Sequence, residues 1–423
     1  MGGRKIKLLI LSYPVWNERN NSVNTYINLF GNTDRYEVAN ISTLPGKPYG
    51  TVCKRFFNIS EKGLLSALVG TANAGKEIYQ EDDLSSLPIA KESNLLKKAK
   101  ILRFQIFFWI REMIWSFGSW KTKQLDEFIK SFDPDAVVLP IKHTRFFNKL
   151  GQYVHKVSGK PLIGFVSDDV YSYYGYSRSP LVWLDGAICR PVIRKSLQKC
   201  DLVLTLTEKQ KKEYDQLFGI NCQVITKGGT FVNKPEYNPN KHVKLVYTGN
   251  IGAGRWQSLA LIGDALKESD AELDIYTGTP ITSMQKDLIL RSGKVNMKGF
   301  VAQGEIKNIQ LDADILVHVE SFMREEKYSA RLSFSTKIVD YLEAHRCILA
   351  VGWAGTAAIE YLKDNNAACV VTSIEDIKNE IESLITSSDR MKQLADNSYA
   401  LGVTNHNNDV IKEKLYHYIL EIL

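Results

Sequence analysis

The sequence lacks several features that define well-known classes of protein. Its six cysteines include no Cys-x-x-Cys pair, and none has a histidine at metal-ligand spacing, so a zinc site is not expected. No uninterrupted apolar run is long enough to span a membrane. No dinucleotide glycine fingerprint follows residues 9–12, which argues against a dehydrogenase. The excess of 54 lysines and arginines over 47 acidic residues is too small to indicate a nucleic-acid partner.

The sequence also shows no sign of disulfide bonds and no clear signal peptide, and both absences bear on the cell compartment. Several cysteines lie in apolar runs, such as Cys347 in CILAVG, where buried free thiols are expected, and free thiols indicate a reducing compartment. The start of the chain is basic and then apolar, but its apolar run is short and is better explained as a first buried strand than as a signal peptide. A cytoplasmic location follows as the expectation.

Short apolar runs separated by helical patterns are present throughout the chain. Such runs are typical of buried strands in βαβ units and predict an α/β fold with parallel sheets. In the first half they fall at residues 7–12, 36–41, 135–140, 161–166, 201–206 and 223–226, and in the second half at 243–247, 273–276, 295–297, 315–319, 347–351 and 368–371.

The chain of 423 residues is long enough for two domains. Residues 233–241 are polar with two prolines and are interpreted as the linker. We therefore predict an N-terminal domain over 1–235, a second domain over 236–407, and an amphipathic helix within 408–423 that packs back on the first domain. Two such domains facing each other would place a ligand at the carboxyl ends of their strands, in a central cleft.

A glycine-rich turn joins the strand at 243–247 to a predicted helix at 259–267. It contains Gly249, Asn250, Gly252 and then Arg255. Glycines allow a ligand close to the backbone, a helix start attracts phosphate, and arginine adds a bidentate cation. The turn does not match Gly-x-Gly-x-x-Gly, and a simple tight turn is the alternative.

A second candidate segment runs from Arg331 to Leu362. A helix predicted to start near Ser335 and Thr336 places Lys337 in its first turn, the unfavourable end of the helix dipole for a cation unless it serves a bound anion. Glu343 lies near the helix end, before a buried strand, where a carboxylate could accept hydrogen bonds from vicinal sugar hydroxyls. The alternative is an ordinary solvated Lys and Glu on an amphipathic helix.

Residues 335–352 resemble the donor-site signature of retaining GT-B glycosyltransferases of the family four type, found in bacterial surface-polysaccharide synthesis. The resemblance rests on Ser335-Thr336-Lys337, Asp340-Tyr341-Leu342, Glu343-Ala344 and Ile348-Leu349-Ala350. It implies a GT-B fold of two Rossmann-like doubly wound domains. It also implies that Glu343 holds the donor ribose, that Lys337 lies near the diphosphate, and that Gly249, Asn250 and Arg255 form the family's glycine turn and phosphate site.

The sequence departs from this family at two places. Many members have a second Glu eight residues before the ribose Glu, where this chain has Ser335, and the usual Gly-Lys-Pro is His345-Arg346-Cys347. Arg331 and the charged residues 324–327 could line the sugar loop, although a surface charge run is the alternative for 324–327.

In the first half the resemblance is looser. Residues 160–171 resemble the strand where family members place a catalytic His or Asp, which makes Asp168 and Asp169 candidates, with capping of the next helix as the alternative. His143, after the strand at 135–140, is a further candidate, although a lone His is more often structural. The loop containing Asn21 and Ser22 falls where acceptors bind in the family.

The resemblance implies a hexosyltransferase-like enzyme that moves a sugar from a nucleoside diphosphate sugar to a glycan or polyprenyl-linked glycan, with retention. Capsule, O-antigen or exopolysaccharide synthesis is the implied pathway. No Asp-x-Asp doublet stands in a donor context, so neither a metal nor another cofactor is expected. A sugar-nucleotide 2-epimerase and a catalytically silent sugar-nucleotide-binding partner remain alternatives.

Residues 95–120 mix lysine and arginine with phenylalanine and tryptophan. This composition suits a helix lying in an anionic membrane interface, which predicts a peripheral contact with the inner face of the membrane. The alternative is a helix packed on the sheet with its Lys and Arg facing water.

Overall fold

The computed structural model describes residues 4–19, 23–31, 34–68, 70, 73–80, 105–174, 179–237 and 239–423. Asn21, Ser22 and residues 95–104 of the predicted interfacial segment therefore lie outside the described residues. The chain forms two compact units. Unit 1 comprises Met1–Thr205, Lys211–Ile225 and Lys412–Leu423, and unit 2 comprises Leu206–Gln210 and Thr226–Ile411. The predicted domain boundaries at 235/236 and 407/408 stay predictions.

Unit 1 contains a sheet whose described strands follow the order β4-β3-β2-β1-β5-β6-β7-β8. All neighbouring strands pair in parallel except β3 and β4, which are antiparallel. The strands are β1 (Ile6–Ser12), β2 (Tyr36–Ser42), β3 (Cys53–Ile59), β4 (Gly75–Ile78), β5 (Ala136–Pro140), β6 (Leu162–Val166), β7 (Leu202–Thr205) and β8 (Cys222–Val224).

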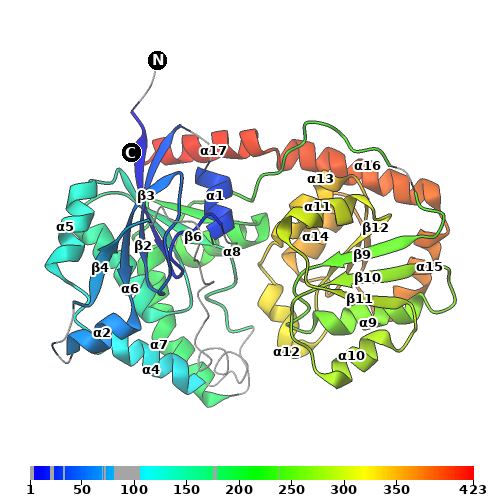
Figure 1. The fold of residues 1–423 in the computed structure, drawn as a ribbon, viewed down its shortest axis with the longest axis horizontal. Coiled ribbons are helices and arrows are strands. Elements are labelled where there is room, and N and C mark those ends of the chain that lie inside the picture. The colour runs from blue at the N-terminus through cyan, green and yellow to red at the C-terminus, as the bar shows by residue number, and fades with distance from the viewer. Residues whose placement is uncertain are drawn as a thin grey trace. The chain divides into compact units, whose positions relative to one another are not determined.

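Helices accompany this sheet on both faces (Figure 1). They are α1 (Asn24–Phe30), α2 (Glu61–Leu68), α4 (Gln105–Phe117), α5 (Lys123–Phe132), α6 (Arg145–Ser158), α7 (Pro180–Leu197), α8 (Glu208–Phe218) and α17 (Asn408–Leu420). Cover on both faces explains why consecutive residues of β1 are buried, from Leu8 to Leu11. Helix α6 buries Phe147, Leu150 and Val154 at helical spacing and ends at Gly159, which adopts φ 63°.

Unit 2 contains a parallel sheet with the described order β11-β10-β9-β12-β13-β14. This is the doubly wound Rossmann order, in which the chain reverses direction across the sheet between β9 and β12. The strands are β9 (Lys244–Thr248), β10 (Glu272–Tyr276), β11 (Val295–Gly299), β12 (Ile315–Val319), β13 (Cys347–Val351) and β14 (Cys369–Val371).

The helices of unit 2 pack around this sheet and enclose its apolar core. They are α9 (Arg255–Ala265), α10 (Ser283–Leu290), α11 (Gln303–Leu311), α12 (Arg324–Lys327), the 3-10 turn η2 (Tyr328–Ala330), α13 (Thr336–Ala344), α14 (Ala357–Asp364), α15 (Ile377–Ile385) and α16 (Ser388–Asn405). No helix among the described residues combines the length and apolar character that crossing a membrane would require.

The α/β class with two doubly wound sheets is confirmed, and each predicted strand is present within two residues of its predicted ends. Two details differ. Strands β3 and β4 were not predicted, because Lys54 and Arg55 interrupt the apolar pattern of β3 and GKEI has none. Helix α9 begins at Arg255 instead of residue 259, because Gly254 takes the left-handed conformation of its N-cap at φ 74°.

Candidate functional site in unit 2

The predicted glycine turn lies at the carboxyl end of β9, beside the point where the strand order reverses. Gly249 has φ 136°, and a Cβ there would lie 2.7 Å from Lys337 Nζ. At Gly254 a Cβ would lie 2.3 Å from Ser321 Oγ. The Asn250 side chain closes the turn by accepting from Gly252 N at 2.6 Å. The turn therefore brings the backbone against two other segments, at the edge of an open α/β sheet where ligands bind.

Arg255 is engaged by a carboxylate that the sequence analysis missed. Its Nε donates to Glu320 Oε2 at 3.0 Å and its Nη2 to Oε1 at 3.2 Å. Glu320 directly follows β12 and is almost fully buried. Burial raises the pKa of Glu320, an effect opposed by the charges of Arg255 and Lys337. The arginine fork predicted to bind phosphate is thus held by an internal anion.

Lys337 lies in the same surroundings. Its Nζ donates to the Tyr247 hydroxyl at 3.2 Å and lies 4.4 Å from the centre of that ring. Loss of solvation, with the neighbouring charge of Arg255, lowers the pKa of Lys337 to about 8, against the opposing effect of Glu320. Arg255 and Lys337 therefore both interact electrostatically with the one carboxylate of Glu320. This excess of positive charge favours a bound anion.

His318 completes this cluster from β12. It is fully buried, and neither ring nitrogen has a hydrogen-bond partner among the described residues. Its Nε2 lies 3.7 Å from Glu320 Oε1. Burial lowers the pKa of His318 to about 3, with smaller contributions from Lys337 and Arg255, so the ring is neutral at physiological pH. We call Tyr247, Arg255, His318, Glu320 and Lys337 the β9–β12 cluster.

Glu343 lies further along α13, within a different group of contacts. Its Oε1 accepts from Lys307 Nζ at 2.7 Å and its Oε2 from Thr230 N at 3.1 Å. Asp340 links the two regions, because its charge acts on Lys337 and it is itself affected by Glu343. Glu343 is partly exposed, and each carboxylate oxygen retains a second lone pair for a ligand.

The remaining predicted donor residues surround the start of α13. Ser335 occupies the N-cap position, but its side chain makes no capping hydrogen bond. Thr336 is the first helical residue and is exposed. Arg331 is buried, and its carbonyl accepts from Ala357 N at 2.9 Å. Residues 324–327 form the short helix α12, in which Lys327 Nζ lies 4.7 Å from the centre of the Trp353 ring.

Candidate functional site in unit 1

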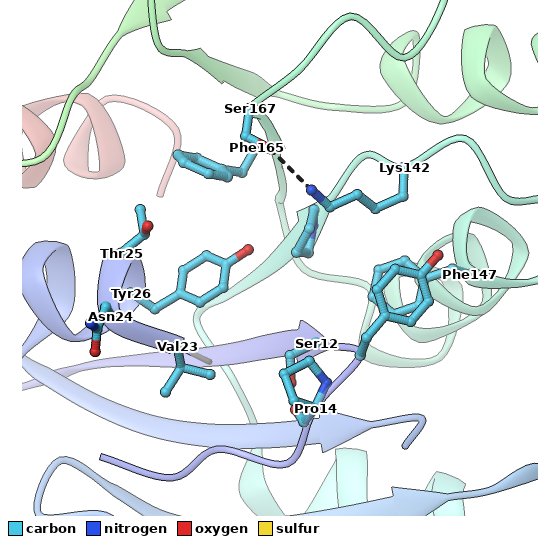
Figure 2. Close-up of a pocket in the computed structure, with 12 residues that line it drawn as sticks. Ser12, Pro14, Val23, Asn24, Thr25, Tyr26, Lys142, Phe147, Phe165 and Ser167 are labelled. Atoms are coloured by element: carbon cyan, nitrogen blue, oxygen red, sulfur yellow. Dashed lines mark hydrogen bonds between the residues drawn. The ribbon is translucent and has the colours of Figure 1, made fainter. Parts of the chain in front are cut away.

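A cavity of about 210 Å³ opens at the corresponding edge of the unit 1 sheet (Figure 2). Its wall includes residues at or after the ends of β1, β5 and β6, and the first residues of α1. The lining residues are Ser12, Tyr13, Pro14, Val23, Asn24, Thr25, Tyr26, Pro140, Lys142, Phe147, Phe165 and Ser167. Aromatic rings beside a few polar groups are typical of a site for a small polar ligand.

Lys142 connects this cavity to the predicted carboxylates. Its Nζ donates to Ser167 Oγ at 3.0 Å, as Figure 2 shows, and lies 3.8 Å from Asp168 Oδ2. Ser167 Oγ in turn donates to Asp168 Oδ2 at 2.8 Å. The exposed Asp168 carboxylate therefore belongs to a polar chain that reaches the cavity wall.

The other two residues predicted to be catalytic have local structural contacts. Asp169 accepts from Ser172 N at 3.0 Å and closes a turn well before α7, so it does not cap that helix. His143 Nδ1 lies 3.0 Å from the Val170 carbonyl oxygen and its Nε2 lies 3.4 Å from Asp185 Oδ2. Although burial opposes it, the contacts with Asp185 and Val170 raise the pKa of His143.

Sequence reasoning missed Tyr247 and Lys142, and also the pair His318 and Glu320. The signal for the pair was present: residues two apart on a strand share a face, and both lie in LVHVES at the carboxyl end of a buried strand. Within the described ranges, no group of three or more His, Cys, Asp or Glu residues is arranged to hold a metal ion.

Relation to known structures

Two doubly wound sheets are the architecture of the GT-B fold, which solved structures share along nearly the whole chain. No family model and no curated protein sequence matches the chain. HepE from Anabaena, solved with UDP-glucose, has 13% identity and a TM-score of 0.61, over 98% of this chain and 100% of that one.

Two other solved proteins are similar over nearly their full lengths. Sucrose-phosphate synthase from Thermosynechococcus elongatus has 10% identity and a TM-score of 0.64, over 99% of both chains. A glycosyltransferase from Rickettsia africae has 13% identity and a TM-score of 0.60, also over 99% of both chains. At these identities the likeness shows the fold, and the chemistry has to be argued from the residues of this chain.

Proposed function

We propose that this protein is a glycosyltransferase that moves a sugar from a nucleoside diphosphate sugar to a glycan or lipid-linked glycan, with retention of configuration. The observation that carries the proposal is the β9–β12 cluster, in which Arg255, paired with Glu320, and Lys337, bonded to Tyr247, lie beside a glycine turn. The complexes of HepE with UDP and with UDP-glucose support a nucleoside diphosphate as the anion.

The chemistry of the transfer requires charge stabilisation on the leaving group. As the bond between the anomeric carbon and the phosphate oxygen breaks, its electron pair moves to the diphosphate, and the acceptor oxygen forms the new bond. Arg255 and Lys337 would stabilise that negative charge in partly desolvated surroundings, where each cation has a larger effect than in water. We propose no metal and no other cofactor for this step.

The other predicted residues take supporting roles in the proposal. Glu343 would accept hydrogen bonds from the donor ribose, and Gly249, Asn250 and Gly252 would let the diphosphate approach the backbone. Ser335, Thr336 and Arg331 would line the sugar loop. The cavity of unit 1 would take the acceptor, with Asp168, Asp169 or His143 orienting its hydroxyl or receiving its proton.

A catalytically silent sugar-nucleotide-binding protein is the second candidate. The observation that favours it is Ser335, which offers no carboxylate at the start of α13, where the retaining family has Glu. Ligand binding would then be retained without transfer. The acceptor identity and a role in bacterial surface-polysaccharide synthesis, together with cytoplasmic location at the inner membrane face, belong to the transferase proposal.

Thermal unfolding with a panel of nucleoside diphosphate sugars tests donor binding. A donor that binds the folded state stabilises it by about 2.7 kcal/mol at a concentration one hundred times its dissociation constant, so its addition raises the melting temperature. Lys337→Met should weaken binding of the best donor at least about tenfold, since it removes one of two cations from the cluster. Lys363→Met on α14 is the matched control, because Lys363 is an exposed helical lysine outside the cluster.

Release of the nucleoside diphosphate, measured with and without a lipid-linked glycan acceptor, then separates enzyme from binder. Acceptor-dependent release that Lys337→Met reduces and Lys363→Met preserves supports transfer. Binding without release supports the silent candidate. A panel in which no donor raises the melting temperature overturns both.

A further inference from the structure

Helix α4 presents an apolar face to the outside of unit 1. Phe107, Ile110, Met113 and Phe117 are between 37% and 72% exposed and fall on one side of the helix. The two charged residues of α4 turn inward. Arg111 donates to Glu61 Oε1 at 2.7 Å, and Glu112 accepts from the first backbone amides of α6. Arg111, the basic residue within α4, therefore pairs with Glu61 and does not extend outward.

Helix α7 repeats this arrangement. Leu181, Leu184 and Ile188 are exposed on one side, and Trp183, also exposed, stacks on Tyr173 at a ring distance of 5.1 Å. Arg190 is turned toward the Tyr171 carbonyl oxygen, to which it donates at 2.8 Å. The charged residue that α7 does expose is Lys195, close to its end.

The two faces are joined. Trp109 of α4 donates through Nε1 to Asp185 of α7 at 3.1 Å, and both helices pack against α6. Asp185 is therefore turned inward as well, toward Trp109 and His143. Figure 1 shows α4 and α7 side by side at one edge of unit 1. We call the seven exposed residues Phe107, Ile110, Met113, Phe117, Leu181, Leu184 and Ile188 the α4–α7 face.

The charges around this face indicate what covers it. Both acidic side chains of the two helices are used in internal contacts, whereas Lys195 and Lys199 are exposed at the end of α7. Among their described residues these two helices expose apolar side chains but no carboxylate, and lysines follow at the end of α7. This combination suits an anionic lipid surface, parallel to which such helices lie.

We propose that the α4–α7 face docks unit 1 onto an anionic phospholipid surface, with α7 contributing as much of the contact as α4. This inference extends the membrane contact predicted for residues 95–120 to a second helix, and it rests on the proposed function only in placing the enzyme beside a lipid-linked acceptor. The large apolar side chains insert among the lipid acyl chains, while the lysines meet the phosphates.

Sedimentation of the full chain with vesicles tests this docking. The protein should bind vesicles of phosphatidylcholine with phosphatidylglycerol, and at least about tenfold more weakly those of phosphatidylcholine alone. The double variant Met113→Glu/Ile188→Glu should lower binding to the anionic vesicles at least about tenfold, because two carboxylates then enter the face. Met284→Glu, at an exposed methionine of α10 in unit 2, should leave it unchanged.

A second double variant, Phe117→Ser/Leu181→Ser, should also lower vesicle binding. The melting curve of each variant is recorded, so that a loss of binding caused by misfolding can be recognised. The proposal is overturned if the unmodified protein does not bind, or if both double variants bind the anionic vesicles as well as the unmodified protein does. Light scattering gives a further outcome that would overturn the proposal. If the unmodified protein is a dimer and the variants are monomers, the α4–α7 face joins two copies of the chain and does not bind lipid. The melting shift caused by a donor, measured on the same samples, reports on the transferase proposal independently.

Discussion

Lys337 changes its charge close to physiological pH. Its pKa of about 8 belongs to the state without ligand, and a bound diphosphate would raise it because opposite charges favour the protonated form. Binding should therefore be at full strength below about pH 8 and weaken as the pH rises above it, by up to about tenfold per unit. Calorimetric titration with a nucleoside diphosphate across this range checks the prediction.

Lys337→Arg provides the control, since arginine stays protonated throughout the range. The variant should lose the pH dependence even if its affinity differs from that of the unmodified protein. An unchanged pH dependence in the arginine variant would assign it to a group other than Lys337.

His318 makes a second prediction, about stability. Its pKa is about 3 in the folded protein against 6.5 for the unperturbed group, so the unfolded chain binds more protons between these values. The stability associated with the neutral ring is then lost as the pH falls from about 6.5 toward 3, at about 1.4 kcal/mol per unit. His318→Phe removes this pH-dependent contribution. Urea unfolding should therefore show that the free energy of unfolding falls less with decreasing pH in the variant than in the unmodified protein.

Val317→Ala provides a comparison at a fully buried position of the same strand, because it removes packing but no titratable group. Its loss of stability should be the same at each pH. A parallel response of both variants would mean that burial of His318 does not determine the slope.

For single residues, the sequence predicted which side chains belong to the candidate site better than it predicted which of them pair. Arg255 and Lys337 were identified from their positions at a turn and a helix start, and they do share one cluster. The pairing of Arg255 with Glu320 could not be predicted, because the two are 65 residues apart and meet only through the order of β9 and β12.

Among the elements, the turn between β9 and α9 is the most constrained part of the candidate site. Gly254→Ala should destabilise unit 2 by about 1–2 kcal/mol from its left-handed backbone alone, and by more because the new Cβ would meet Ser321 Oγ. Gly293→Ala is matched in backbone, at φ 73°, with no atom within 4 Å of the new Cβ. Chemical unfolding should show the larger loss for Gly254→Ala, and equal losses would contradict this account.

Buried parallel strands were the most predictable elements, because cover on both faces requires an uninterrupted apolar run. Residues 315–319 and 347–351 were predicted with the ends that β12 and β13 have. Strand β4 was not predicted from the sequence. It is a short antiparallel strand that forms because it pairs with β3, and its own composition carries no apolar pattern. The inward turn of Arg111 in α4 was equally unpredictable, as it requires the position of Glu61.

For the molecule as a whole, the last residues of the chain complete unit 1. Leu415 is fully buried, Arg35 pairs with Glu413 at 2.6 Å, and the Arg35 guanidinium lies over the Tyr416 ring. Leu415→Ala should cost about 2–5 kcal/mol. Leu420→Ala, at a 45% exposed position of the same helix, should cost little.

Calorimetry of the two variants locates the effect within the molecule. Leu415→Ala should lower the unfolding temperature of unit 1, while the affinity of unit 2 for a nucleoside diphosphate is retained. Loss of that affinity in Leu415→Ala would show that unit 2 depends on the same helix.

The pairing of Arg35 with Glu413 has a consequence for biosynthesis. These partners are separated by 378 positions, so at roughly 5–20 residues per second the ribosome adds the second on the order of tens of seconds after the first. During that interval the emerging unit 1 has its sheet but lacks Tyr416, which packs against Tyr36, so the apolar surface of Tyr36 is then open to chaperones. Final maturation of unit 1 therefore waits for the synthesis of α17.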